Sequence, residues 1–418
     1  MKNIRAFFLI IFISLLLPLK LAAVTYPVLS EESEISMLTA SPGDELYSVF
    51  GHNAVRVTDP ANNIDLVFNY GTFDFDTPNF YVKFARGKLL YKLSVVPMEY
   101  FMAEYRFDGR AIFEQVLNLT LPEKQKMFNY LMENSLPENA YYHYDFFYDN
   151  CATRIRDLAD NVLDIEWYEH PGIVPEYLAG IRSTLDYEFK YQPSYDLFRS
   201  LREMLQPFLV NMPWSAFGID LALGIPSDKV ATYYDFMYLP DEMLIAFALA
   251  RHSDGRQLVS EHRILLQQTT QLPPAGFFTP EKVFWALFIL SLISFINWRF
   301  SRIFDLSFFT LLGITGLVIL ILWFFTDHIT TKINLNILWA IPTHLYYIWV
   351  STYEHKKPAG VIYFRIVSLL SFAMLVLWSF IPQDFNSAFF PIILTALVKS
   401  IPYAFRIPYL TDHLTSKK

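Results

Sequence analysis

The chain has 418 residues, of which 53% are hydrophobic and only 18% are charged, and its formal net charge is −8. A soluble globular chain carries about 25% charged residues, so part of this protein is expected to lie in a membrane. The negative charge argues against nucleic acid as a partner, because a phosphate-binding surface needs a basic stripe.

The N-terminus is laid out as a secretory signal peptide. Two early cations precede an apolar core over residues 6–17, and a Leu-Ala-Ala stretch follows. Pro18 and Lys20 interrupt the apolar run before it reaches the roughly 20 residues of a spanning helix. We therefore predict export, with residues 1–23 as the signal peptide. An uncleaved signal anchor would give the same topology.

Residues 24–272 are predicted to form an exported domain that mixes strands and helices. Polar and apolar residues alternate in two stretches separated by a turn, which predicts a hairpin. Pro122 suits the first turn of a helix, and residues 165–272 are expected to be mostly helical. The predicted elements are strands at 53–57, 64–70 and 111–119, and helices at 121–136 and 151–162.

Residues 281–406 are predicted to form a helical membrane domain, joined to the exported domain by a linker at 273–280. Arg299 and Arg302 follow the first apolar segment, and Lys356 follows the third. This alternation places the exported domain outside and the tail, 407–418, in the cytoplasm by the positive-inside rule. The five apolar segments are 283–296, 306–325, 335–350, 361–381 and 388–404.

Three polar side chains lie near the outer end of the third apolar segment. They are Asn334, Asn336 and His344. Polar groups at membrane depth are costly unless they have partners. They therefore indicate either a cavity that admits lipid or hydrogen bonds between helices.

Cys151 is the only cysteine, so the exported domain has no disulfide and its thiol is either inert or kept for chemistry. The aromatic, turn-like residues before it place Cys151 at the N-terminus of the predicted helix 151–162. Unpaired N–H groups and the helix dipole lower the pKa of a thiol at such a position. We therefore predict a nucleophilic thiolate, with a small buried core residue as the alternative.

A cysteine nucleophile needs a base, and His52 is the preferred candidate among nine histidines. It stands at the entry of a predicted strand, after Gly51. Asn69, on the next strand, is the candidate for orienting the imidazole, with Asp74 as the alternative and a turn-capping role also open for Asn69. Three charged residues follow the cysteine and either pin the helix or meet phosphate groups. They are Arg154, Arg156 and Asp157.

Four segments carry a resemblance to a known family: SVFGHNAVRV (48–57), FNYGTFDFDTPNFYVKFARGKLLYKL (68–93), YDFFYDNCATRIRD (144–157) and NLNILWAIPTHL (334–345). With them, the whole chain resembles the Lnb-type lipoprotein N-acyltransferases of Bacteroidota. The order of histidine, polar residue and cysteine is also similar to that of circularly permuted papain-like hydrolases, such as lecithin retinol acyltransferase. Those relatives often have a second histidine near residue 69, and this chain has none.

The resemblance implies an α+β fold, in which a circularly permuted papain-like periplasmic domain precedes an all-α membrane domain of about five transmembrane helices. It implies a multi-pass protein of the bacterial inner membrane. Cys151 would take an acyl chain from a phospholipid, with His52 as base and Asn69 as the third residue, and pass it to the α-amino group of a diacylated lipoprotein. No cofactor, metal or nucleic-acid partner is expected.

Two other functions stay open at this point. The same cysteine and histidine would serve a membrane-tethered papain-like amidase or peptidase that acts on cell-wall peptides, with water as the acceptor. A lipid-binding or assembly protein with a degenerate site would need neither residue. Five appended apolar segments favour a lipid substrate, because a wall hydrolase needs only an anchor or none.

Overall fold

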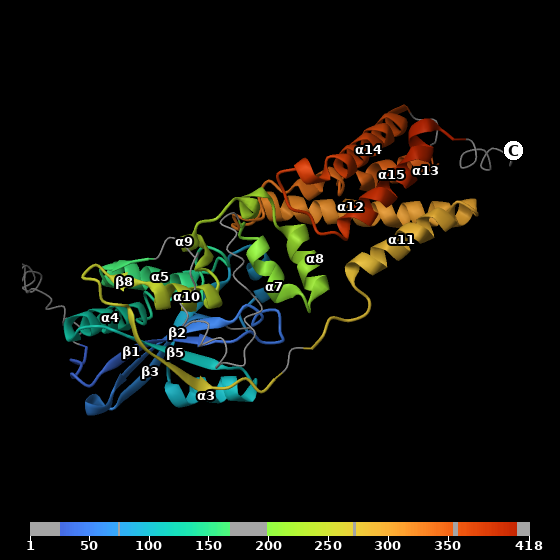
Figure 1. Cartoon of the computed structure of the whole chain (residues 1–418). Helices are drawn as coiled ribbons and strands as arrows, with labels where there is room; N and C mark the ends of the chain where they lie inside the picture. Colours follow the sequence, from blue (N-terminus) through green and yellow to red (C-terminus); the bar gives the residue numbers. More distant parts are fainter. Residues whose placement is uncertain (1–25, 74–75, 168–198, 271–272, 354–357, 408–418) are drawn as a thin grey trace, which may run out of the picture.

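The computed structural model describes residues 26–73, 76–167, 199–270, 273–353 and 358–407. The predicted signal peptide and Asp74 lie outside the described residues. The chain forms a sheet domain and a helical bundle that lie end to end, with short helices between them (Figure 1).

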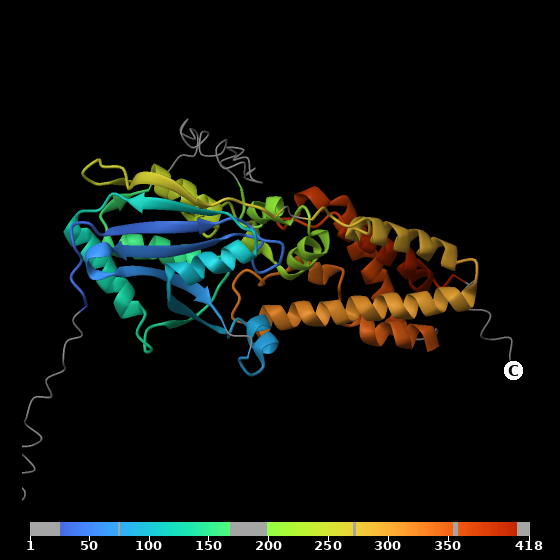
Figure 2. The same cartoon turned by 90° about the horizontal axis from the view of Figure 1, so that it is seen from below.

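One seven-stranded antiparallel sheet organises the sheet domain, in the order β6-β4-β3-β2-β1-β5-β9 (Figure 2). Its strands are β1 (Glu34–Ala40), β2 (His52–Asp59), β3 (Ile64–Thr72), β4 (Leu90–Pro97), β5 (Ile112–Leu117), β6 (Tyr141–His143) and β9 (Val259–Leu266). A smaller pair joins β7 (Ile165–Glu166) and β8 (Arg251–His252).

The predicted hairpin is confirmed as β2 and β3, joined through a 3-10 turn at Pro60–Asn62. Asn63 takes a left-handed conformation, with φ of 53°, which an asparagine tolerates in a tight turn. The strand predicted at 111–119 is β5. The edge strand β9 was not predicted, since residues 165–272 were expected to be mostly helical and β9 is defined mainly by its pairing with β5.

Helices cover both faces of the sheet. On one face lie α4 (Leu121–Asn134), α5 (Cys151–Val162) and α10 (Pro240–Leu249), and on the other lies α3 (Met98–Phe107) (Figures 1 and 2). Both α4 and α5 were predicted, and each begins with a capping box, the side-chain and backbone hydrogen bonds that satisfy the first free N–H groups. The main core lies between the sheet and α4, α5 and α10.

The helical bundle contains α11 (Pro280–Ser294), α12 (Trp298–Phe324), α13 (His344–Tyr353), α14 (Pro358–Val376) and α15 (Phe389–Phe405). Within the described residues, α12 and α14 are long and apolar enough to cross a membrane, and α15 is a shorter apolar helix. The third predicted segment is broken into a 3-10 turn, Leu335–Leu338, and α13, because Pro342 interrupts the run and the Asn334 and Asn336 side chains bond to another helix.

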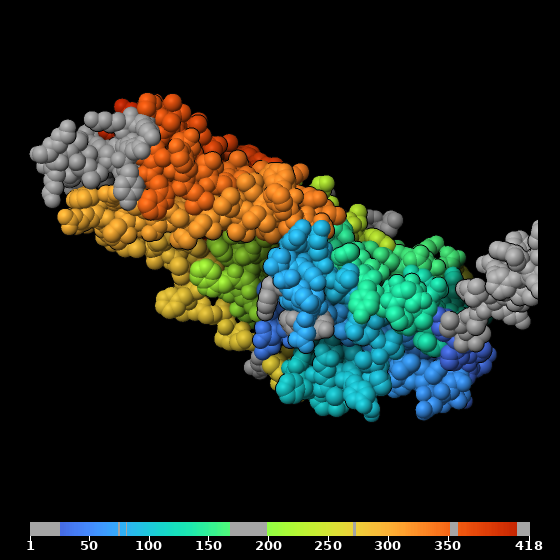
Figure 3. All heavy atoms as spheres, turned by 180° about the vertical axis from the view of Figure 1, so that it is seen from behind, coloured from blue at the N-terminus to red at the C-terminus, as the bar shows by residue number. Residues whose placement is uncertain are grey.

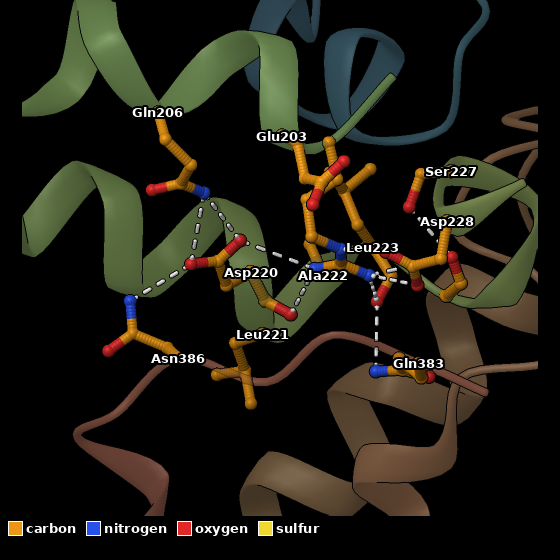
Figure 4. Close-up of polar contacts among 12 residues, drawn as sticks. Glu203, Gln206, Asp220, Leu221, Ala222, Leu223, Ser227, Asp228, Gln383 and Asn386 are labelled. Atoms are coloured by element: carbon orange, nitrogen blue, oxygen red, sulfur yellow. Dashed lines mark hydrogen bonds and ion pairs between the residues drawn. The ribbon is translucent and has the colours of Figure 1, made fainter. Parts of the chain in front are cut away.

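A polar joint connects the two bodies through short helices, α7 (Gln206–Leu209) and α8 (Pro213–Ala222). The buried Arg202 guanidinium binds Asp228 at 2.5 Å and Asp220 at 3.3 Å. From the bundle side, the Asn386 amide donates to Asp220 at 2.9 Å (Figure 4). The buried Arg202 and its two carboxylates thus tie the short helices to the bundle through hydrogen bonds and ion pairs. The remaining short helices are α2 (Phe80–Ala85) and α9 (Tyr233–Phe236).

Candidate active site

Cys151 is the first residue of α5 and lies in a rigid setting. The Asn150 side chain accepts from the Thr153 N–H at 2.9 Å and donates to the carbonyl oxygens of Phe146 and Tyr238, each at 2.8 Å. Thr153 in turn accepts from the Asn150 N–H at 2.7 Å. The cysteine is therefore held at the helix start, with only 8% of its surface exposed.

The structure brings together His52, Asn69 and Cys151. The His52 Nε2 atom lies 2.6 Å from the Asn69 Oδ1 atom, and a hydrogen bond links the imidazole to Cys151. Since an amide oxygen only accepts, Nε2 carries a proton and Nδ1 is left for the thiol. The alternation predicted for β3 is also observed, because Phe68 and Tyr70 contact α4 while Asn69 turns to His52.

Two glycines allow the strands β2 and β3 to come close to their neighbours at this site. Gly51 has φ of +83°, and a Cβ there would lie 2.9 Å from the Ala40 carbonyl oxygen. Gly71 has φ of +92°, and a Cβ there would lie 3.6 Å from the Cys151 Cβ and 3.7 Å from the His52 Cε1. A side chain at Gly71 would strain the backbone because of the positive φ, and its Cβ would lie in contact with the Cys151–His52 pair.

The electrostatics favour a thiolate facing an imidazolium. Burial opposes ionisation of the Cys151 thiol, but His52 and the backbone N–H groups of Asn53 and Ala152 outweigh burial and lower its pKa below the ordinary value. Burial likewise disfavours the charged form of His52, yet Cys151 and the hydrogen bond to Asn69 raise its pKa. Each member of the pair thus stabilises the charged form of the other.

Two residues of this site escaped the sequence reasoning. Asn150 is the cap that fixes Cys151, and its signal was available, since asparagine is among the residues preferred at the N-cap of a helix. Tyr142 is the second. Its hydroxyl is buried without a hydrogen-bond partner among the described residues, and burial and the Cys151 thiolate raise its pKa well above the ordinary value. No sequence pattern predicts that placement.

The other charged candidates around α5 have structural partners. Arg154 forms an ion pair with Asp149 and lies 4.1 Å above the Tyr142 ring. Arg156 pairs with Asp157 at 2.8 Å. The contacts of Arg154, and the hydrogen bond of 3.3 Å from Arg156 to the Tyr234 carbonyl oxygen, connect α5 to its surroundings, which agrees with the interpretation that these residues pin the helix. Within the described part of the chain, no cluster of three or more His, Cys, Asp or Glu side chains is arranged to hold a metal ion.

The polar residues of the third membrane segment also have protein partners. Asn334 and Asn336 donate to the carbonyl oxygens of Leu221 and Asp220, at the end of α8. The His344 Nδ1 atom lies 2.9 Å from the Tyr363 hydroxyl. Hydrogen bonding between helices therefore accounts for these side chains.

Comparison with known families identifies both bodies. Residues 27–171 match the Lnb N-terminal periplasmic domain, and residues 273–407 match the Lnb transmembrane domain. The chain belongs to the Lnb family. Membership gives a periplasmic domain on a transmembrane domain of the inner membrane, and a lipoprotein N-acylation-type role at the level of the Lnb family. The comparisons give no significant match to a curated protein or to a solved structure.

Proposed function

We propose that this protein moves an acyl chain from a phospholipid to the α-amino group of a diacylglyceryl-cysteine lipoprotein, through a thioester on Cys151. This proposal depends mainly on the Cys151–His52 pair, in which each residue stabilises the charged form of the other. The pair lies in a domain that is fused to a membrane domain. The pair lies at the membrane-proximal end of the sheet, because Phe50, next to Gly51, contacts Phe208 of α7 at 5.8 Å between ring centres.

The first half-reaction forms the thioester. The Cys151 thiolate attacks the ester carbonyl carbon, and the new C–S bond creates a tetrahedral oxyanion. When the ester C–O bond breaks, the imidazolium of His52 gives its proton to the departing alkoxide of the lysophospholipid. Asn69 keeps the ring oriented through its 2.6 Å hydrogen bond, and so acts as a positioning residue.

The second half-reaction regenerates the enzyme. The free α-amino group of the lipoprotein attacks the thioester, His52 takes the proton from the attacking nitrogen, and the C–S bond breaks to release the Cys151 thiolate. Thioesters react readily with amines, and water competes for the same intermediate. A site that is almost closed to solvent, with Cys151 only 8% exposed, supports transfer over hydrolysis.

Donors for the oxyanion are available at the start of α5 and across the site. The first N–H groups of a helix have no partners within the helix. The Tyr142 hydroxyl is a second donor, since its raised pKa keeps it protonated and no described residue binds it. Donors placed where negative charge develops are commonly a large part of the rate enhancement of acyl transfer.

Two structural proposals accompany this function. The order His52, Asn69 and Cys151, with two adjacent strands facing a helix start, supports a circularly permuted papain-like fold for the periplasmic domain. The five helices α11–α15, with cations in alternate loops, support a multi-pass bundle of about five spans.

Mass spectrometry of the intact protein tests the proposal. The full chain in phospholipid vesicles should gain the mass of one acyl group, and Cys151→Ala should gain none. A synthetic diacylated lipopeptide should then remove the acyl group and become N-acylated. Hydrolysis of wall peptides without any acylated Cys151 would instead favour the amidase, and an unacylated protein without hydrolysis would favour a non-enzymatic role.

A further inference from the structure

The short helix α2 touches the outer end of the membrane domain. The Asp327 N–H donates to the Arg86 carbonyl oxygen at 3.0 Å, and the His328 Nε2 atom lies 3.2 Å from the Phe84 carbonyl oxygen. Figures 2 and 3 show this segment beside the end of α12. The 27 residues of α12 span roughly 40 Å, more than the ~30 Å of a hydrocarbon core, so its last turn reaches the headgroup region.

The side chains on the surface of α2 are of the kinds found in the headgroup region of a membrane. Val82 and Phe84 are 58% and 54% exposed. Lys83 and Arg86 lie beside them, and neither forms an ion pair with a residue that the structure describes. A helix that combines exposed apolar side chains with cations is typical of the bilayer interface, where the cations meet phosphate groups.

The exposed apolar surface of α2 is continuous with that of the membrane domain. Beyond α12, the chain that touches α2 also exposes large apolar side chains. The exposed residues at this end of the bundle are Phe324, Phe325, Ile329 and Ile333. Because α12 is long and apolar enough to cross a membrane and exposes large apolar side chains along its length, the shared apolar surface points to lipid as the neighbour of α2.

A row of aromatic rings leads from α2 to the Cys151–His52 pair. Neighbouring ring centres are 6.4 Å apart for Phe84 and Phe80, 5.8 Å for Phe80 and Phe73, and 5.2 Å for Phe73 and Tyr91. Tyr91 then stacks on Tyr144 at 4.3 Å. The row ends next to the reactive cysteine, because an ideal Cβ on Gly71, two residues before Phe73, would lie 3.6 Å from the Cys151 Cβ and 4.0 Å from the hydroxyl of Tyr142, two residues before Tyr144.

We propose that α2 lies in the outer leaflet and that this aromatic row guides an acyl chain of a membrane glycerophospholipid to Cys151, with the phosphate beside Lys83 and Arg86. The inference rests on the proposed function for the identity of the acyl group. The rings offer flat apolar faces along which a hydrocarbon chain lies without displacing polar contacts, and the row runs from an exposed end to a buried one.

Spin-label accessibility tests the lipid contact without reference to activity. Because Cys151 is the only cysteine, Cys151→Ser gives a clean background for one label on Val82→Cys. Val28→Cys is the matched control, since Val28 is 78% exposed and its carbonyl oxygen is bound by Asn62 at the far end of the sheet. In vesicles, the label at 82 should be reached by oxygen and shielded from a water-soluble nickel complex. Equal nickel access at both positions would overturn the placement.

Acylation rates test the route itself. Phe84→Asp should acylate Cys151 from vesicle phospholipid about tenfold more slowly, because an apolar contact between the phenyl ring and the acyl chain is lost. It should react with a soluble p-nitrophenyl ester at the wild-type rate. Phe84→Leu should restore the vesicle reaction, and Val28→Asp should change neither rate.

The outcomes separate this inference from the proposed function. An unchanged vesicle rate for Phe84→Asp, or an equal loss with both esters, would overturn the route while leaving the acyl transfer in place. If the wild-type chain were not acylated by vesicle phospholipid at all, the proposed function would fail, and the route with it. The spin label would still decide whether α2 contacts lipid.

Discussion

The Cys151–His52 pair of the periplasmic domain and the Lys399–Asp305 pair of the membrane domain are both buried, and they differ in what surrounds them. In the bundle, the Lys399 ammonium lies 2.9 Å from an Asp305 carboxylate oxygen. Its remaining donors go to the hydroxyls of Ser294 and Ser301, at 2.9 and 2.7 Å. Tyr403 binds the other carboxylate oxygen. The ammonium thus has three oxygen neighbours, and the carboxylate oxygen that faces it has no hydrogen-bond partner among the described residues beyond this ion pair.

The Cys151–His52 pair, by comparison, has a hydrogen-bond donor close by that no described residue uses. Asn69 and backbone N–H groups hold its two members, but the nearby Tyr142 hydroxyl has no partner among the described residues. A buried charge surrounded by its counter-charge and hydroxyl groups holds helices in register, whereas one with an unused donor nearby is prepared for a reacting group. The difference separates a structural ion pair from a reactive one.

Disrupting the Cys151–His52 pair should have the largest effect on the acylation rate. His52→Ala should slow acylation of Cys151 by a soluble ester about 1000-fold, since both the base and the stabiliser of the thiolate are lost. The Cys151 pKa should rise, so alkylation by iodoacetamide, which is retained toward low pH in the wild type, should shift to higher pH. An alkylation profile unchanged by the substitution would contradict the thiolate–imidazolium pair.

Disrupting the Lys399–Asp305 pair should lower the stability of the protein and leave the reaction rate at Cys151 unchanged. Lys399→Met leaves the Asp305 carboxylate buried without its cation and should lower the free energy of unfolding by about 3 kcal/mol. Denaturant titration in detergent micelles measures the loss. Adding Asp305→Leu should restore most of it, and the soluble-ester rate should stay at the wild-type level. A lower ester rate in the folded protein would instead give this ion pair a part in the chemistry.

Removing the unpartnered Tyr142 hydroxyl should have an intermediate effect on the rate of thioester formation. Tyr142→Phe should reduce the rate of thioester formation about 100-fold, as for loss of one oxyanion donor. The pH dependence of Cys151 alkylation should not move, because alkylation develops no oxyanion. A shift in the alkylation profile with an unchanged ester rate would show that Tyr142 acts on the thiol alone.

The smallest effect is expected at the positioning residue. Asn69→Ala should lower the soluble-ester rate about tenfold, because the imidazole keeps its place beside Cys151 but loses the hydrogen bond that orients it. It should also lower the pKa of His52, whose charged form Asn69 favours, and NMR titration of the ring measures that change. Asn69→Gln, which keeps the amide, should lose less. An unchanged rate for Asn69→Ala would return Asn69 to a turn-capping role.

Much of the periplasmic domain could be predicted from local pattern. The bounds of α5 and the β2–β3 hairpin follow from periodicity and turn residues, which act over a few positions. Cys151 is predicted from its position at a helix start, whereas the pairing with His52 depends on its strand entry after Gly51 together with the resemblance to the Lnb-type acyltransferases. The edge strand β9 was missed, since a strand that pairs only with β5 is set by a partner more than 140 residues away.

The sequence by itself indicated the membrane domain, a thiol at a helix start and a candidate histidine, because hydropathy, charge alternation and turn residues are written in neighbouring residues. Only the tertiary structure decided that Asn69 contacts His52, that the Tyr142 hydroxyl is left unpaired, and that α2 meets the end of α12. Those contacts join residues distant in the chain. They depend on how strands and helices pack, and no local pattern encodes that packing.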